Sequence, residues 1–292
     1  MSGRTVASDH DISYAARTGE PVEPVRTSTA DEVRSAVDRA TAAAPALAAT
    51  HPADRLRWLE SLADALEHPG TAEGLVRVAD RETGLGTARL EGELARCAGQ
   101  LRFYGRVAVE GSFLGATVDH RTDTTPDLRR MRVPLGPVAV LGASNFPFAF
   151  GVLGGDTGSA LAAGCPVVTK AHPAHPATSR ALADVATSAL AGAGAPVGAF
   201  DLVAGFDAGT ALVLSPAITA VAFTGSQQAG LALWRLASER EVVIPVYAEM
   251  GTVNPVVMTS AATSSARASS APSRGCSSSR PATTCRASSA RP

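Results

Sequence analysis

Four sets of polar residues each lie at the end of a short apolar run, where they could bind a ligand together. They are Asn145, Lys170, the tripeptide Thr224-Gly225-Ser226, and Glu249. Because the carboxyl ends of parallel strands meet at one edge of an open sheet, we expect these residues to gather at that edge. An amide can donate a hydrogen bond to an oxyanion, and an ammonium group or the free N–H groups at a helix start can bind a phosphate. A carboxylate can act as a general base.

Residues 136–250 are expected to form the α/β core that positions these groups. Strands are predicted at 137–142, 166–170, 200–204, 218–223 and 242–247, with helices between them at 151–164, 177–192, 207–214 and 227–239. Val-rich strands that alternate with helices indicate a doubly wound parallel sheet, of the Rossmann-like class, covered on both faces.

The sequence before this core divides into three parts. Residues 1–25 show no periodic apolar pattern and are expected to be a loosely held arm. Residues 26–108 are predicted to form three helices. The first begins at a capping box made by Thr29 and Glu32, the second begins at Pro52, and the third spans about 87–104. Residues 109–135 alternate in polarity between turn residues, which predicts an extended hairpin.

One charged face of the predicted helix at 87–104 has two alternative interpretations. Its members are Arg89, Glu91, Glu93 and Arg96. A solvated helix face is the interpretation that the charge pattern favours over a functional site.

Composition limits the class of protein. The chain has 292 residues, of which 45% are hydrophobic, and its formal net charge is −1. Such a balance gives no reason to expect a nucleic acid or an anionic membrane as a partner. The N-terminus lacks the apolar core of a signal peptide, and four widely spaced cysteines suit a reducing compartment. We therefore expect a cytoplasmic protein.

The last 34 residues, 259–292, differ in kind from the rest. They include eleven Ser, eight Ala and five Arg, and no Leu, Ile, Val, Phe, Asp, Glu or Lys. Such a segment buries too little apolar surface to offset the entropy of ordering it, so disorder is predicted. An out-of-frame translation is the favoured explanation, and a natural flexible tail is the alternative.

Several motifs resemble those of the aldehyde dehydrogenase superfamily. They are Gly-Ala-Ser-Asn-Phe-Pro at 142–147, Gly-Gly-Asp-Thr at 154–157, Lys-Ala-His-Pro-Ala-His-Pro at 170–176, and the runs 220–226 and 246–251. They are most similar to the NADP-using branch that acts on 2,5-dioxovalerate (α-ketoglutaric semialdehyde). The resemblance covers about residues 25–258, so 251–258 is expected to begin a catalytic domain that is largely missing.

The resemblance implies catalytic roles for two residues. Asn145 would hold the oxyanion that forms when a thiolate attacks the aldehyde, although an Asn that only satisfies its own turn is the alternative. Glu249 would be the general base that activates water, with a surface carboxylate as the alternative. The surrounding motifs favour the functional interpretation for both.

The resemblance also implies a dinucleotide site. Its candidate residues are Ser144 with the backbone of 141–144, Lys170, His172, Thr224, Gly225 and Ser226. NAD-preferring members tend to carry a glutamate where this chain has Pro173. Because no carboxylate there repels a 2′-phosphate, NADP is the expected cofactor and NAD the alternative.

The nucleophilic cysteine is where the chain departs from the family. Family members carry it in a Gly-Gln-x-Cys context, which neither Cys276 nor Cys285 shares. Cys165, between a predicted helix and a strand, is expected to lie in the core, and Cys97 is expected to lie on an early helix. No catalytic cysteine is assigned, because a thiolate needs a structured, electropositive surrounding.

Three hypotheses follow. The first is an aldehyde dehydrogenase that lacks most of its catalytic domain and is inactive; the second is an NADP-binding remnant without turnover. A short-chain reductase is disfavoured because its glycine fingerprint and Tyr-x-x-x-Lys pair are missing. No metal is expected, since His172 and His175 have no third ligand nearby, and whether the chain forms the family's homo-oligomer stays open.

Overall fold

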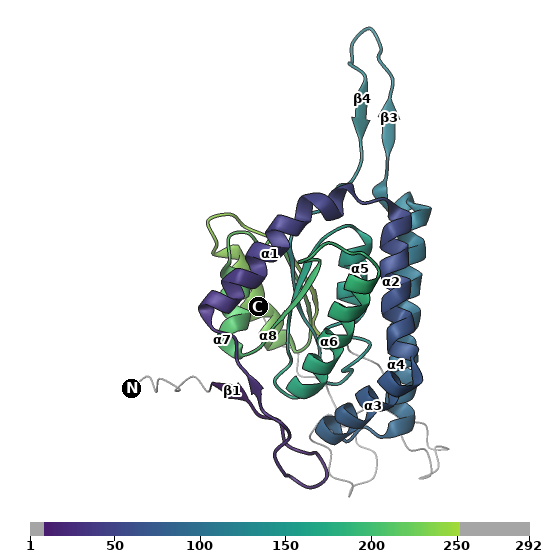
Figure 1. The fold of residues 1–292 in the computed structure, drawn as a ribbon. Coiled ribbons are helices and arrows are strands. Elements are labelled where there is room, and N and C mark those ends of the chain that lie inside the picture. The colour runs from purple at the N-terminus through teal and green to yellow at the C-terminus, as the bar shows by residue number, and fades with distance from the viewer. Residues whose placement is uncertain (1–8, 252–292) are drawn as a thin grey trace, which may run out of the picture. The chain divides into compact units, whose positions relative to one another are not determined.

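The computed structural model describes residues 9–251, and a five-stranded parallel sheet lies at their centre (Figure 1). Its strands are β5 (Val138–Leu141), β6 (Val167–Lys170), β7 (Phe200–Val203), β8 (Ala220–Thr224) and β9 (Val246–Glu249), in the order β7-β6-β5-β8-β9. The chain first builds outward from β5 to β7 and then returns to the other side of β5. This order confirms the predicted doubly wound α/β fold and places a topological switch point between β5 and β8.

Helices cover both faces of the sheet because side chains alternate along each strand. Val138 and Val140 pack into one apolar cluster, which includes helices α5 (Gly155–Ala162) and α6 (Pro176–Gly192). Ala139 packs into the other cluster, with helices α7 (Phe206–Leu214) and α8 (Gln227–Ser238). Buried apolar residues on both faces explain why these strands read as continuous Val- and Ala-rich runs.

The last strand begins later than predicted. It was expected at 242–247, but β9 begins at Val246, and both Val242 and Val243 are exposed. Pro245 interrupts the apolar run and has no N–H to donate to a ladder. Glu249 is therefore the last residue of the strand rather than a residue of the following loop.

The N-terminal part forms four helices, one more than the sequence indicated. They are α1 (Ala30–Ala49), α2 (Pro52–Glu67), α3 (Pro69–Thr83) and α4 (Thr87–Glu110). The capping box of Thr29 and Glu32 is present at the start of α1. Helix α3 was not predicted, because Pro69 and Gly70 are typical of a turn. Proline is also suited to the first position of a helix, and α3 begins at Pro69.

Two hairpins flank this unit. Strands β1 (His10–Asp11) and β2 (Val25–Arg26) pair antiparallel, and Val22 between them is buried. The described residues 9–25 thus pack against the fold, unlike the loosely held arm expected. After a 3-10 turn (Ser112–Leu114), strands β3 (Thr117–Asp119) and β4 (Leu128–Arg130) pair antiparallel and project beyond the helices (Figure 1).

Two sequence-based expectations lie beyond the described residues. They concern the start of a catalytic domain after residue 251 and the tail at 259–292, with Cys276 and Cys285. Within 9–251, no helix combines the length and the apolar character needed to span a bilayer.

Candidate functional site

Asn145 lies in the loop after β5, with its side chain exposed beside exposed Ser144. The loop closes on itself, because the N–H of Ala143 donates to the carbonyl of Phe150 at 2.7 Å. Among the hydrogen bonds between residues 9–251, none uses the side-chain amide of Asn145. That amide is therefore available to a ligand, which weighs against the alternative in which it serves only its own turn.

Glycines let this loop fold back tightly. A Cβ atom on Gly151 would lie 1.9 Å from the carbonyl oxygen of Pro147, and one on Gly142 would lie 2.6 Å from that of Phe150. Backbone atoms cannot approach a real Cβ so closely, so only glycine fits at these two positions. The position of Asn145 thus depends on a backbone path that other residues would disturb.

Helix α4 holds the loop from the side. Glu93 is only 5% exposed, and its Oε1 accepts hydrogen bonds from the N–H groups of Phe148 at 2.8 Å and Ala149 at 3.1 Å. The interpretation of this helix face as solvated is therefore wrong for Glu93. Helical spacing alone could not reveal the error, because the partners are backbone groups 55 and 56 residues away.

Lys170 is the last residue of β6 and lies at the same edge of the sheet. It is 9% exposed, and its aliphatic carbons run along Gly209. Burial lowers the pKa of Lys170, whereas the charge of Asp11 opposes that shift. A buried ammonium group at a strand end is a suitable partner for a phosphate or a ribose hydroxyl.

His172 and His175 lie against each other in the segment that follows β6. Their rings stack with centroids 5.0 Å apart, and His175 is buried with Nε2 3.2 Å from the carbonyl oxygen of Ala143. Burial lowers the pKa of His172 to about 3, with smaller contributions from His175 and Lys170. Within the part of the chain that the structure describes, no three His, Cys, Asp or Glu residues could hold a metal ion together.

Thr224 and Glu249 lie directly beside each other at the ends of β8 and β9. The N–H of Gly225 donates to the carbonyl of Glu249 at 3.0 Å, which fixes the turn to the strand. Ser226 caps α8 and accepts a hydrogen bond from the N–H of Ala229 at 3.2 Å. The predicted base and the predicted pyrophosphate turn are thus one structural unit.

Asp156 is a member of this unit that the sequence did not single out. It lies in the first turn of α5, and its Oδ2 accepts a hydrogen bond from the Thr224 hydroxyl at 3.4 Å. Burial raises the pKa of Asp156, and the charge of Glu249 raises it further. A carboxylate inside the Gly- and Ala-rich run at 154–164 was the sequence signal that could have identified it.

The described cysteines are unsuited to nucleophilic attack. Cys97 and Cys165 are both buried and unpaired. Burial raises the pKa of Cys97 to about 12, and its thiol faces the carbonyl of Leu153 at 3.7 Å. The expectation that Cys165 lies in the core is confirmed, and Cys97 on α4 is buried as well.

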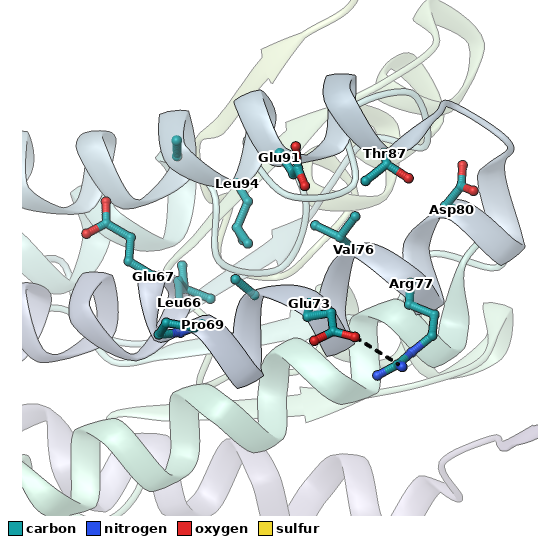
Figure 2. Close-up of a pocket in the computed structure, with 12 residues that line it drawn as sticks. Leu66, Glu67, Pro69, Glu73, Val76, Arg77, Asp80, Thr87, Glu91 and Leu94 are labelled. Atoms are coloured by element: carbon teal, nitrogen blue, oxygen red, sulfur yellow. Dashed lines mark ion pairs between the residues drawn. The ribbon is translucent and has the colours of Figure 1, made fainter.

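A separate cavity of about 570 Å³ lies among α2, α3 and α4, away from these residues (Figure 2). Leu66, Val76 and Leu94 line it, and the ion pair between Glu73 and Arg77 lies at its rim. Its residues on α4 are Thr87, Glu91, Leu94 and Ala95. Helical geometry puts these on the side of α4 opposite Glu93, so the cavity is not part of the candidate site.

The chain is similar in sequence to aldehyde dehydrogenases. The model of the aldehyde dehydrogenase family matches residues 6–279. Alpha-ketoglutaric semialdehyde dehydrogenase 2 of Azospirillum brasilense is 48% identical over 253 residues, which are 84% of this chain and 48% of that protein. Alpha-ketoglutaric semialdehyde dehydrogenase of Acinetobacter baylyi is 43% identical over 79% of this chain and 44% of its own length. The chain therefore spans about half the length of these relatives.

Solved structures agree with this comparison. An NADP dependent enzyme of E. coli superposes with a TM-score of 0.74 at 26% identity, over 83% of this chain and 48% of that one. An aldehyde dehydrogenase from Burkholderia cenocepacia superposes with a TM-score of 0.71, also at 26% identity, over 83% and 49% of the two chains.

Proposed function

The chain belongs to the aldehyde dehydrogenase family, and we propose on that premise that it carries the cofactor-binding part of an enzyme that oxidises an aldehyde to a carboxylate with NADP⁺. The proposed substrate is α-ketoglutaric semialdehyde, because two relatives named for that activity are 48% and 43% identical. The observation that carries the proposal is that Lys170 and Glu249 end two strands, and Asn145 follows a third, at the edge that the carboxyl ends of these strands share.

Asn145 is the proposed oxyanion donor. When a thiolate attacks the aldehyde carbon, the carbonyl π electrons move to oxygen, and the side-chain N–H of Asn145 donates to the resulting anion. The support for this role is the unused side-chain amide of Asn145 near the start of a tightly folded loop. Removal of such a donor typically costs ~3 kcal/mol of transition-state stabilisation.

Glu249 is the proposed general base of deacylation. Its carboxylate takes a proton from water while the water oxygen attacks the thioester carbon, and the thiolate leaves as the carboxylic acid product forms. Its exposure at the end of β9 and its place beside Thr224 support access to both water and substrate.

The candidate cofactor residues fit a phosphorylated dinucleotide. NADP⁺, when bound, supplies the hydride acceptor of the oxidation. Lys170 provides a cation, Ser226 opens a helix whose first N–H groups suit a pyrophosphate, and residues 171–175 contain no carboxylate. His172, which its low pKa keeps neutral, and the backbone beside Ser144 complete the proposed set.

We propose that this polypeptide by itself binds NADP⁺ but does not turn over the aldehyde. The two described thiols are buried, and neither Cys276 nor Cys285 stands in the Gly-Gln-x-Cys sequence context in which the family carries its nucleophile. A non-catalytic NADP-binding remnant is the second candidate function, and it shares this prediction for the isolated chain.

Calorimetric titration with NADP⁺ and NAD⁺ tests the proposal, together with an assay of NADPH formation from α-ketoglutaric semialdehyde. We expect binding of NADP⁺ that Lys170→Ala weakens about 10- to 100-fold, as for loss of a charge-assisted contact. Arg180→Ala, an exposed change on α6, is the matched control and should leave the affinity unchanged. Undetectable NADP⁺ binding would contradict both candidates, and steady NADPH formation would contradict the proposed inactivity.

We also propose a reducing compartment and a homo-oligomeric assembly for this protein. Two unpaired thiols support a reducing compartment such as the cytoplasm. The β3–β4 hairpin exposes Val118 and Leu128, which supports a homo-oligomer that uses this hairpin.

A further inference from the structure

Three residues of α4 lie on the face of the helix that contacts the Asn145 loop. Arg89, Glu93 and Arg96 are spaced by four and three positions, which places them along one stripe of an α-helix. We call this set the α4 clamp. Each member contacts a different part of the loop at 145–150.

Arg89 and Arg96 hold the two ends of the loop. Arg89 donates from Nη2 to the carbonyl oxygen of Asn145 at 2.9 Å, and its guanidinium lies 5.1 Å from the ring centroid of Phe146. Arg96 lies 5.0 Å from the ring centroid of Phe150. The two phenyl rings also meet edge to face, with centroids 5.5 Å apart. The backbone of the predicted oxyanion donor is therefore bonded directly to the clamp.

Glu93 holds the middle of the loop. Glu93 accepts two hydrogen bonds, from the N–H groups of Phe148 and Ala149. A hydrogen bond to a carboxylate is about twice as strong as the same bond to a neutral acceptor. The other oxygen of Glu93, Oε2, is buried without a hydrogen-bond partner among the described residues. An apolar side chain at this position would leave the N–H groups of Phe148 and Ala149 without this acceptor, so the carboxyl group ties the loop backbone to α4 although its own second oxygen is unsatisfied.

We propose that Glu93 is a positioning residue, which acts with Arg89 and Arg96 to preorganise the side-chain amide of Asn145 toward the reacting oxygen. This inference rests on the oxyanion role proposed above for Asn145. Oxyanion donors are effective because they are already aimed before charge develops, so a loop free to move would lose that advantage. The clamp supplies the rigidity from a helix that lies outside the loop itself.

The test uses the full chain, ¹⁵N-labelled, with Glu93→Ala, Glu93→Gln and the control Glu91→Gln from the exposed side of the same helix. Amide hydrogen exchange at Phe148 and Ala149 reports the two bonds, and the side-chain NH₂ resonances of Asn145 report its orientation. We expect exchange to accelerate about 100-fold in Glu93→Ala and about 10-fold in Glu93→Gln, which keeps a neutral acceptor. The control should stay within about twofold of the parent.

The Asn145 resonances separate positioning from general stabilisation. They should move in Glu93→Ala and return toward their original shifts in Glu93→Gln, whereas a merely structural change alters exchange alone. Unchanged exchange at Phe148 and Ala149, or unchanged Asn145 resonances in Glu93→Ala, would overturn the proposal. If Glu93→Ala does not fold, Arg89→Ala must move the same resonances, and a silent result there overturns it equally.

NADP⁺ titration of the same samples keeps the two proposals distinct. If the unmodified chain does not bind NADP⁺, the proposed function is contradicted, whereas the exchange result for the clamp still stands. Conversely, normal NADP⁺ binding with unchanged exchange in Glu93→Ala would reject the clamp alone.

Discussion

The Asp156 carboxylate accepts a hydrogen bond from the Thr224 hydroxyl at 3.4 Å. Since Thr224 pairs with Glu249 across β8 and β9, this bond brings a second carboxyl group close to the proposed base. The charge of Glu249 adds to burial in raising the pKa of Asp156. The environment of Glu249 therefore includes Asp156 of α5, which lies 93 residues earlier in the chain.

We first predict that Glu249→Gln lowers the pKa of Asp156. Burial is the main cause of its raised pKa and is unaffected, so the pKa should stay above the ordinary value of 3.8. Removal of the Glu249 charge eliminates only the smaller contribution. Titration of the Asp156 side-chain carbon by NMR measures the shift, and Glu239→Gln, at the far end of α8, is the control. An Asp156 pKa that does not respond to Glu249→Gln would show that the two groups are not coupled.

The second prediction concerns stability at mildly acidic pH. The pKa of His172 falls from 6.5 to about 3 on folding, so the folded state resists its protonation while the unfolded state does not. Its contribution is therefore fully present above pH 6.5 and is lost as pH falls from there toward 3. The free energy of unfolding should decline by up to about 1.4 kcal/mol per pH unit in that window from this one group.

Urea denaturation at several pH values measures that slope. His172→Gln should flatten it, because the variant has no proton to take up on unfolding. His120→Gln, in the exposed hairpin, should leave the slope as it is. Equal slopes in all three proteins would assign the acid sensitivity to other groups.

The sheet was predictable because its strands are buried on both faces. Val138, Val167 and Val221 belong to apolar runs that end in polar residues. Between consecutive predicted strands the sequence has enough residues for one helix. The same logic placed Asn145 and Lys170 at one edge. The register that sets Thr224 beside Glu249 depends on backbone pairing, which an apolar pattern does not encode.

The hydrogen-bond partners of Glu93 and Asp156 could not be predicted because they are distant in the chain. Glu93 lies on a helix with charges at many positions, and only tertiary packing determines which of them is buried. Its partners are backbone N–H groups, which every residue except proline carries, so the sequence contains no signal for the bond. Asp156 contacts Thr224 only after the sheet is assembled.

The third prediction tests how strictly the loop path is fixed. Gly151→Ala would place a Cβ atom 1.9 Å from the carbonyl oxygen of Pro147, so the backbone must shift. We expect a loss of roughly 2 kcal/mol or more in the free energy of unfolding, together with displaced Asn145 resonances. Thermal and urea denaturation measure the loss.

Gly99→Ala is the matched control for that substitution. No atom lies within 4 Å of its added Cβ, and it occupies the middle of α4. Alanine there should stabilise the protein by roughly 0.5–1 kcal/mol, because glycine is a poor helix former. A similar response from both variants would mean that the loop path is not restricted to glycine.

The final prediction concerns the choice of cofactor. Pro173 is exposed, three residues after Lys170, and carries no charge that could oppose a 2′-phosphate. Pro173→Glu would add a carboxylate, which repels that phosphate and can accept hydrogen bonds from ribose hydroxyls instead. We expect the affinity for NADP⁺ to fall about tenfold and the affinity for NAD⁺ to rise, as a single added charge contact allows. Calorimetric titration with both cofactors measures the two affinities, and Pro173→Gln is the uncharged control. If Pro173→Gln weakens NADP⁺ binding as much as Pro173→Glu does, the effect comes from the loss of proline rather than from charge.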